Sequence, residues 1–256
     1  MKIAVCIKQV PTREWQPRID DARRGVREQD ASFEMNEPDA YALEEALRLR
    51  EKHGGEVVVC TAGPARASQV LREALARGAD RGVHVEDERL SSISTDSFVV
   101  AGALADAMRD EQFDLVLTGL QSDDQGAAQT GVILAERLGL PHATIVMDVQ
   151  VQEPAVRVKR ELEGGWFQWV EMNLPALLTI QSGINQLRYA TLKGIMAAKK
   201  KEIRKVVPAS LPAARAAVTG LDVPRKTKET QVISGSPAEA AKALIAKLRD
   251  QARVIE

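Results

Sequence analysis

The sequence predicts an α/β protein with a doubly wound, mostly parallel sheet, an added β-hairpin and a C-terminal arm that ends in a helix. Short apolar runs such as Glu56–Thr61 (EVVVCT) and Phe113–Gly119 (FDLVLTG) alternate with amphipathic stretches of helical period. Continuously apolar strands are typical of parallel sheets covered on both faces, and right-handed crossovers then place helices on both sides. The length of 256 residues fits one large domain with an appendage, or two small domains.

The elements follow from these signals in chain order. Lys2–Val10 is an apolar β run, and Pro11–Met35 is a polar excursion or small hairpin. Glu37–His53 has helical spacing and is stopped by two glycines. Further helices are expected at Pro64–Arg77, Asp96–Arg109 and Gln129–Leu138. Further strands are expected at Glu56–Thr61, Gly82–Val85, Phe113–Gly119, Ala143–Val149 and Ala176–Ile180. A hairpin is expected to form from Val156–Leu162 and Trp166–Met172, with its turn at Glu163–Gly165.

The C-terminal part has no steady period before its last helix. Pro208–Gly235 is rich in Ala, Pro, Thr and Lys, which predicts an extended arm. Pro237–Arg253 is an amphipathic helix, and Ser236 and Glu239 stand in capping-box positions at its start. This helix either wraps a partner subunit or packs on its own domain.

Composition and charge exclude several classes of function. A net charge of −1 and 4% aromatic residues argue against a nucleic-acid binder, which needs a surplus of Lys and Arg on one face. Cys6 and Cys60 lie in strand-like runs and are expected to be buried, reduced thiols, with no spacing that suggests a metal site. The three histidines are scattered and structural. The N-terminus enters a strand directly and no run is long enough to span a membrane, so we expect a cytoplasmic protein.

The strongest signal for a binding site is the loop Thr118–Gly131 (TGLQSDDQGAAQTG). It joins the end of a strand to the start of a helix, and in an open α/β sheet ligands sit beyond the carboxyl ends of the strands. The chain has no P-loop, no GxGxxG after its first strand and no GxSxG elbow. Small residues in the loop let a ligand approach the backbone, and the helix start favours a phosphate. The loop residues that carry this argument are Asp123, Asp124, Gly126, Ala127, Ala128, Gln129, Thr130 and Gly131.

Other strand ends should converge on the same crevice. Cys6–Gln9 follows the first strand, and Ala62 follows the second. Asn36 is a good N-cap for the first helix, so a capping role competes with a binding role there. These residues alone leave two interpretations of the crevice open, a nucleotide site and a plain polar loop with a capped helix. A rival function on the same α/β layout is a regulatory module that binds ATP and dimerises with itself.

Three separated segments resemble the beta subunit of electron transfer flavoproteins. They are MNEPDAYALEEALRL (Met35–Leu49), GLQSDDQGAAQTG (Gly119–Gly131) and the stretch from Glu161 to Ile203, which contains RYATLKGIMAAKKK. The resemblance covers roughly Lys2 to Ile203. It implies a heterodimer with an alpha subunit that supplies most of the binding site for a redox-active FAD. It also implies that the beta subunit holds an adenine nucleotide. The nucleotide would be lined by Cys6, Asn36, Glu37, Pro38, Asp39, Ala62 and the loop from Asp123 to Val132.

The nucleotide is usually AMP in this family and a second FAD in its electron-bifurcating members. In the bifurcating members the loop resembles DGDTAQVG. This chain has DQGAAQTG at Asp124–Gly131, and its QTG is more similar to the type that holds AMP. The resemblance implies an electron-transfer subunit rather than an enzyme. It would carry electrons from acyl-CoA-type or other flavin dehydrogenases to a quinone-linked acceptor. We therefore expect a nucleotide-binding domain at 1–206, with a partner-recognition segment near 185–203, and a partner-contacting arm and helix at 207–256.

The segment Arg188–Lys201 combines apolar residues with three consecutive lysines. The family's NEPRY is here Asn185–Tyr189, without the proline. In the family, the leucine of the ATL stretch anchors dehydrogenase partners, and here it is Leu192. We expect an exposed apolar side chain on a mobile loop, with basic neighbours that steer the encounter, whereas the alternative is ordinary core packing of Leu192. The expected partner-binding residues are Leu192, Ile195, Met196, Lys199 and Lys200.

Overall fold

The computed structural model describes residues 1–90, 95–224 and 230–255. The chain divides into two compact units, Met1–Leu221 and Asp222–Glu256. The part of the expected arm at 225–229 lies outside the described residues. Among the described residues, no helix is both long enough and apolar enough to cross a membrane.

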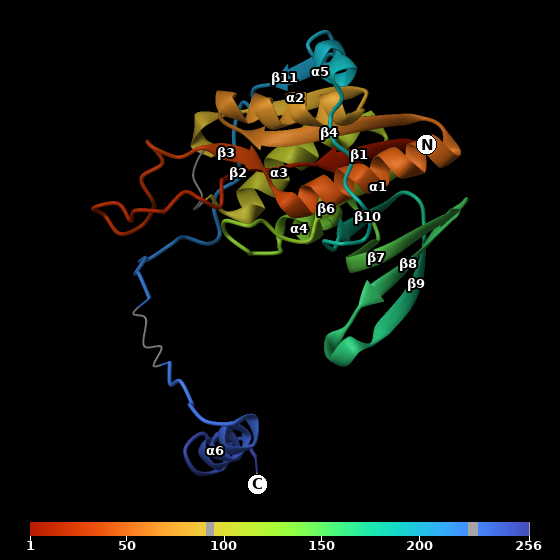
Figure 1. Ribbon diagram of the computed structural model, residues 1–256. Coiled ribbons are helices and arrows are strands. Elements are labelled where there is room, and N and C mark those ends of the chain that lie inside the picture. The colour runs from red at the N-terminus through yellow and green to blue at the C-terminus, as the bar shows by residue number, and fades with distance from the viewer. Residues whose placement is uncertain (91–94, 225–229, 256) are drawn as a thin grey trace. The chain divides into compact units, whose positions relative to one another are not determined.

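The first unit is built on a nine-stranded sheet. Figure 1 shows how its strands lie side by side. Its order is β11-β5-β4-β1-β6-β10-β7-β8-β9, and the neighbours from β11 to β7 are parallel. The predicted parallel α/β fold is therefore confirmed. The strands are β1 (Lys2–Cys6), β4 (Glu56–Gly63), β5 (Arg81–Glu86), β6 (Leu115–Gly119), β7 (His142–Gln152), β8 (Ala155–Glu161), β9 (Phe167–Asn173), β10 (Ala176–Ile180) and β11 (Ile203–Val206).

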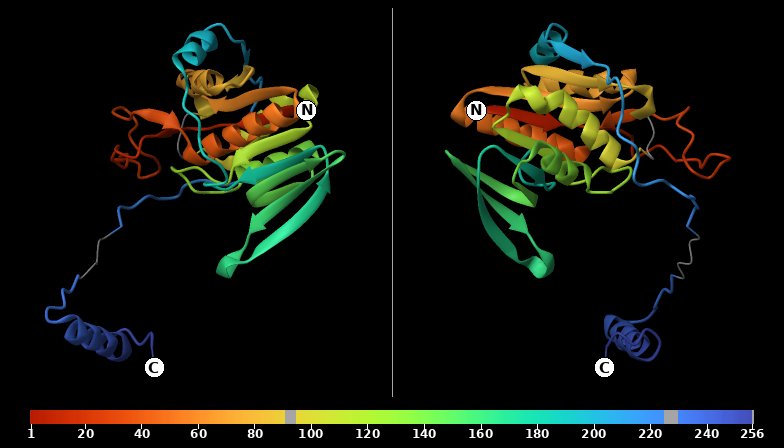
Figure 2. Two further views of the ribbon diagram at one scale, coloured as in Figure 1. Left: turned by 45° about the vertical axis from the view of Figure 1, so that its right-hand side comes forward. Right: turned by 180° about the vertical axis from the view of Figure 1, so that it is seen from behind.

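Helices cover both faces of the parallel part (Figures 1 and 2). Alternate residues of β1 enter two separate cores: Ile3 and Val5 pack towards α1 and α2, and Ala4 and Cys6 pack towards α3 and α4. This alternation is the period of two that a strand imposes on its side chains. The helices are α1 (Glu37–His53), α2 (Ser68–Arg77), α3 (Ser97–Met108) and α4 (Thr130–Leu138), with 3-10 turns at Ala65–Ala67, Glu88–Leu90, Arg109–Glu111 and Glu163–Gly165.

The antiparallel extension lies at one edge of the sheet. β8 and β9 pair in antiparallel register around the predicted turn, with Glu161 opposite Phe167, and β7 also pairs antiparallel with β8. The predicted hairpin is therefore confirmed. The polar excursion after β1 is held by a second, two-stranded sheet of β2 (Gln9–Pro11) and β3 (Phe33–Met35).

Three local predictions were wrong. The run Lys2–Val10 is two strands rather than one, and Pro64–Arg77 is a 3-10 turn followed by α2. The expected mobile loop at Leu192 is instead helix α5 (Leu192–Ala198), which leads into the unpredicted edge strand β11. Thr191 starts α5, since its hydroxyl accepts a hydrogen bond from the amide of Gly194 at 3.0 Å.

The described part of the arm before Leu221 belongs to the first unit. Leu211 packs against the core between the sheet and α3. The amides of Arg215 and Ala216 donate to the Asp96 carboxylate at 2.6 and 3.0 Å. In the second unit, α6 (Pro237–Asp250) starts with the predicted capping box, and none of its residues is buried.

Candidate functional site

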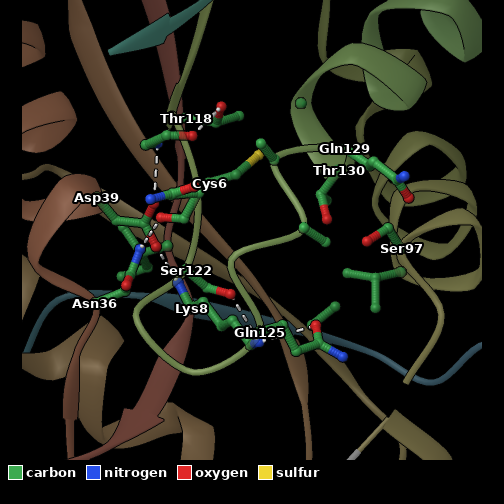
Figure 3. Close-up of a pocket in the computed structure, with 18 of the residues that line it drawn as sticks. Cys6, Lys8, Asn36, Asp39, Ser97, Thr118, Ser122, Gln125, Gln129 and Thr130 are labelled. Carbon is green, nitrogen blue, oxygen red and sulfur yellow. Dashed lines mark hydrogen bonds between the residues drawn. The ribbon is translucent and has the colours of Figure 1, made fainter. Parts of the chain in front are cut away.

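The main cavity lies where β1, β4 and β6 end and α4 begins (Figure 3). It encloses about 110 Å³. Its walls come from the ends of these strands, the first residues of α3 and the loop between β6 and α4. Carboxyl ends of parallel strands are the usual place for a ligand in an open α/β sheet. The fold therefore creates the crevice that the sequence predicted.

The side chain of Asp39 connects the backbone segments that form one side of this cavity. Its carboxylate accepts hydrogen bonds from the amide of Lys8 at 2.7 Å and from the amide of Gly119 at 2.9 Å. Gly119 is the last residue of β6 and Lys8 lies shortly after β1, so one α1 side chain joins the chain at both strand ends. Burial raises the pKa of Asp39 to about 7, and the two amide donors oppose that rise.

Asn36 has a different role from the expected side-chain cap. It stands at the N-cap of α1, but its side chain makes no capping hydrogen bond. Its amide donates to the carbonyl of Gln121 at 3.0 Å, and its oxygen accepts from the amide of Asp123 at 2.9 Å. The prediction of a capping side chain was wrong because both polar atoms of Asn36 hold the loop after β6 instead.

Lys8 holds the same loop from its other side. Its ammonium group donates to Asp124 at 2.7 Å and to Ser122 and Gln125 at 3.3 Å. Asp124 is thus engaged in an ion pair, while the Gln125 amide reaches the carbonyl of Thr95 at 3.2 Å. The loop is therefore fastened to α1, to β1 and to the segment before α3.

Hydroxyl groups gather on the opposite wall. Ser97, only 7% exposed, opens α3, and Thr130 opens α4; both line the cavity and point into it in Figure 3. Among the described residues, the buried hydroxyl of Thr95 on the same wall has no hydrogen-bond partner. Within the same part of the chain, no side chain caps the start of α4, and its first turn contains no acidic residue. Hydroxyl groups beside an uncapped helix N-terminus suit an anionic group such as a phosphate.

The predicted cofactor residues divide into two groups. Those that line the cavity are Cys6, Asn36, Asp39, Ala62, Gln125, Ala127, Ala128, Gln129, Thr130 and Gly131. The others lie outside its lining, namely Glu37, Pro38, Asp123, Asp124, Gly126 and Val132. The sequence reasoning missed Ser97 as a wall residue, whereas Lys8 lies within the stretch Cys6–Gln9 that it placed at the crevice. Ser97 could not have been chosen, because the closeness of the α3 start to the loop depends on tertiary packing.

Cys6 forms part of the wall as a protonated thiol. Burial raises its pKa well above the ordinary value, and its sulfur lies 3.9 Å from that of Met108. Both cysteines are free and buried, as predicted. Within the described ranges, no group of three or more His, Cys, Asp or Glu side chains could hold a metal ion.

A second candidate site is the exposed face of α5 together with the two lysines that follow the helix. We call it the docking face, and it consists of Leu192, Ile195, Met196, Lys199 and Lys200. Leu192 is 84% exposed and Met196 is 64% exposed, so the core-packing alternative for Leu192 is wrong. Lys201 points the other way, because its ammonium group donates to the carbonyls of Leu75 and Ala79 at the end of α2.

Comparison with known proteins gives the family. The electron transfer flavoprotein domain family matches residues 24–211. The electron transfer flavoprotein subunit beta of Methylophilus methylotrophus is 42% identical over 210 residues, which cover 80% of this chain and 79% of the relative. The human subunit beta is 34% identical over 261 residues, 99% of each chain. The mitochondrial subunit beta of Oryza sativa subsp. japonica is 36% identical over 256 residues, the whole of both chains. The chain therefore belongs to the electron transfer flavoprotein family, as a beta subunit.

Proposed function

We propose that this beta subunit pairs with an alpha subunit and carries electrons from flavin dehydrogenases to a quinone-linked acceptor. It holds AMP in the main cavity, while the alpha subunit supplies most of the site for the redox-active FAD. It is an electron-transfer subunit and not an enzyme by itself. It acts in the cytoplasm, where reduced thiols such as Cys6 and Cys60 persist.

The cavity is the observation that carries the nucleotide part of the proposal. Its strand-end position fits a phosphate group, as do the uncapped start of α4 and the Thr95 hydroxyl, which has no partner in the described part of the chain. Ser97 and Thr130 would donate to that phosphate. AMP would act structurally, since it fills the space between the three segments that Asn36, Asp39 and Lys8 already hold together.

Nucleotide and flavin analysis of the assembled protein tests this part. The chain is co-produced with a candidate alpha subunit, its flavin spectrum is recorded, and the released nucleotides are identified by chromatography. We expect one FAD and one AMP per heterodimer. Two FAD would replace the AMP assignment with a second flavin, as in electron-bifurcating complexes. A homodimer with ATP and no flavin would contradict the whole proposal.

The docking face carries the partner part of the proposal. An exposed leucine can fill a pocket of a dehydrogenase, and the lysines at the end of α5 favour encounter with an acidic surface. Leu192→Ala should leave folding and FAD content intact and lower the efficiency of reduction by a dehydrogenase about tenfold, the effect of a modest hot spot. Equal rates for the two proteins would refute the docking role.

A further inference from the structure

The segment that leads into α5 is fastened to α1 by an arginine. Arg188 lies four residues before Leu192, and Figure 1 shows this part of the chain crossing α1 on its way from β10 to α5. Its guanidinium donates to Glu44 at 2.7 and 3.0 Å and to Glu51 at 2.5 and 3.2 Å. Its backbone amide also donates to Glu44, at 3.3 Å. One side chain thus spans two turns of α1.

The two glutamates that Arg188 contacts differ in their burial. Glu44 is only 5% exposed, and its carboxylate is compensated by Arg188 at 2.7 Å and, less closely, by Arg48 at 3.5 Å. Glu51 lies at the surface, and the hydrogen bond from Arg188 lowers its pKa. Forked, charge-assisted pairs have strict orientation, which a single lysine contact does not provide. The backbone at Arg188 is therefore held in one place.

The chain is restrained by hydrogen bonds both before and after helix α5. Before it, the Asn185 amide donates to the carbonyl of Tyr41 and to Glu45, both at 3.1 Å. After it, the Arg72 guanidinium donates to the carbonyls of Ala198 and Lys201 at 2.6 and 2.8 Å. The exposed apolar side chains in between are displayed on a helix of only seven residues. A helix this short depends on such tertiary contacts for its stability.

We propose that Arg188 is a positioning residue for electron transfer. Its hydrogen bonds to Glu44 and Glu51 of α1, which we call the clamp, hold the docking face in the orientation that a dehydrogenase recognises. This inference rests on the docking role proposed for Leu192. A pre-ordered contact loses less conformational entropy when the partner binds than a mobile one does. Removing the clamp therefore weakens docking even though Arg188 need not touch the dehydrogenase.

The test compares Arg188→Gln, Leu192→Ala and the double variant, each as the FAD-containing heterodimer. The probe is an acyl-CoA dehydrogenase that reduces the natural heterodimer. We expect Arg188→Gln to lower kcat/KM for this reduction about fivefold, an effect within the range for coupled contact residues. In the Leu192→Ala background the same change should have less than about a twofold effect, because the anchor it positions is already gone. Chemical reduction by dithionite should be unchanged.

Two controls separate positioning from general stability. Arg81→Gln removes another arginine that bridges two glutamates, Glu56 and Glu111, and that forms no ion pair with the 185–201 segment. It should leave kcat/KM unchanged. Glu51→Gln removes only the exposed half of the clamp. If Arg188→Gln does not fold, the Glu51→Gln variant still tests the inference. We expect Glu51→Gln to lower kcat/KM about twofold. Hydrogen exchange of residues 189–198 should speed up in both clamp variants.

The outcomes are distinct. If Leu192→Ala has no effect, the proposed docking function fails, whatever Arg188 does. If Leu192→Ala slows reduction but neither clamp variant does, docking stands and the positioning role of Arg188 is wrong. Effects of Arg188→Gln and Leu192→Ala that multiply in the double variant would also overturn the inference, because Arg188 would then act independently of the anchor.

Discussion

The sharpest prediction concerns Asp39→Asn, which keeps the shape of the side chain and removes its ionisable group. In the natural protein the two carboxylate oxygens accept from the amides of Lys8 and Gly119. An asparagine has one oxygen, so one of these amides would face the NH2 group instead. An amide that loses its acceptor in a buried place costs about 1–3 kcal/mol. We expect this loss of stability in mildly acidic buffer.

The loss should depend on pH. The pKa of Asp39 is about 7 in the folded protein and has an ordinary value of 3.8. Between these values the folded state binds more protons than the unfolded state, so the stability contributed by Asp39 falls as the pH rises. The full shift corresponds to about 4 kcal/mol. Asparagine does not titrate, so the difference between variant and natural protein should shrink as the pH rises to about 8.

Denaturant unfolding of both proteins from about pH 5 to about pH 8 measures this difference, and all other titrating groups are common to the two proteins. AMP content, measured in parallel, shows whether the cavity still holds its nucleotide. A stability difference that stays constant across this pH range would refute the raised pKa. A stability that is unchanged at about pH 5, where Asp39 is protonated in the folded state, would refute its role as the link between the two strand ends.

The remaining predictions concern close packing and charge. Gly131→Ala would place a Cβ 2.6 Å from the Thr118 hydroxyl, so the start of α4 should shift and nucleotide analysis should find less bound AMP. Gly194→Ala would place a Cβ 2.2 Å from the carbonyl oxygen of Ala76. It should displace α5 and slow reduction by a dehydrogenase without loss of AMP; normal kinetics would contradict the observed seating of this helix. Glu111→Gln should lower the denaturation midpoint at neutral pH. That difference should vanish as the pH falls from 4.5 to about 2, because a hydrogen bond from an arginine holds the pKa of Glu111 at about 2; a constant difference would argue against the ion pair.

Strong local signals were sufficient to predict much of the fold. The bounds of α1 and β10 agree with the prediction at both ends, because glycines or prolines flank continuous helical or apolar patterns. The place of β10 in the sheet could not be predicted, since it lies between β6 and β7 although β8 and β9 precede it in the chain. That order is decided by tertiary packing. Helix α5 was missed because a seven-residue segment with a glycine has little helical signal of its own.

The cavity was predicted in position but not in detail. The rule about strand ends correctly located the loop after β6, while the roles of individual polar groups depended on distant neighbours. Asn36 follows the sequence preference for an N-cap, yet its side chain contacts residues 85 and 87 positions later in the chain. Ser97 gave no signal because its hydroxyl becomes notable only when α3 folds beside α4. Local patterns do not contain such information.

Helix α1 is shared by two regions that are otherwise separate. Asp39 near its start fastens the cavity, and Glu51 near its end fastens the approach to the docking face. At a rise of 1.5 Å per residue, these two positions are about 18 Å apart along the axis. Substitutions in this helix should therefore be pleiotropic, impairing cofactor retention and partner choice together. A random mutagenesis screen scored separately for each trait should find its overlapping hits concentrated in α1.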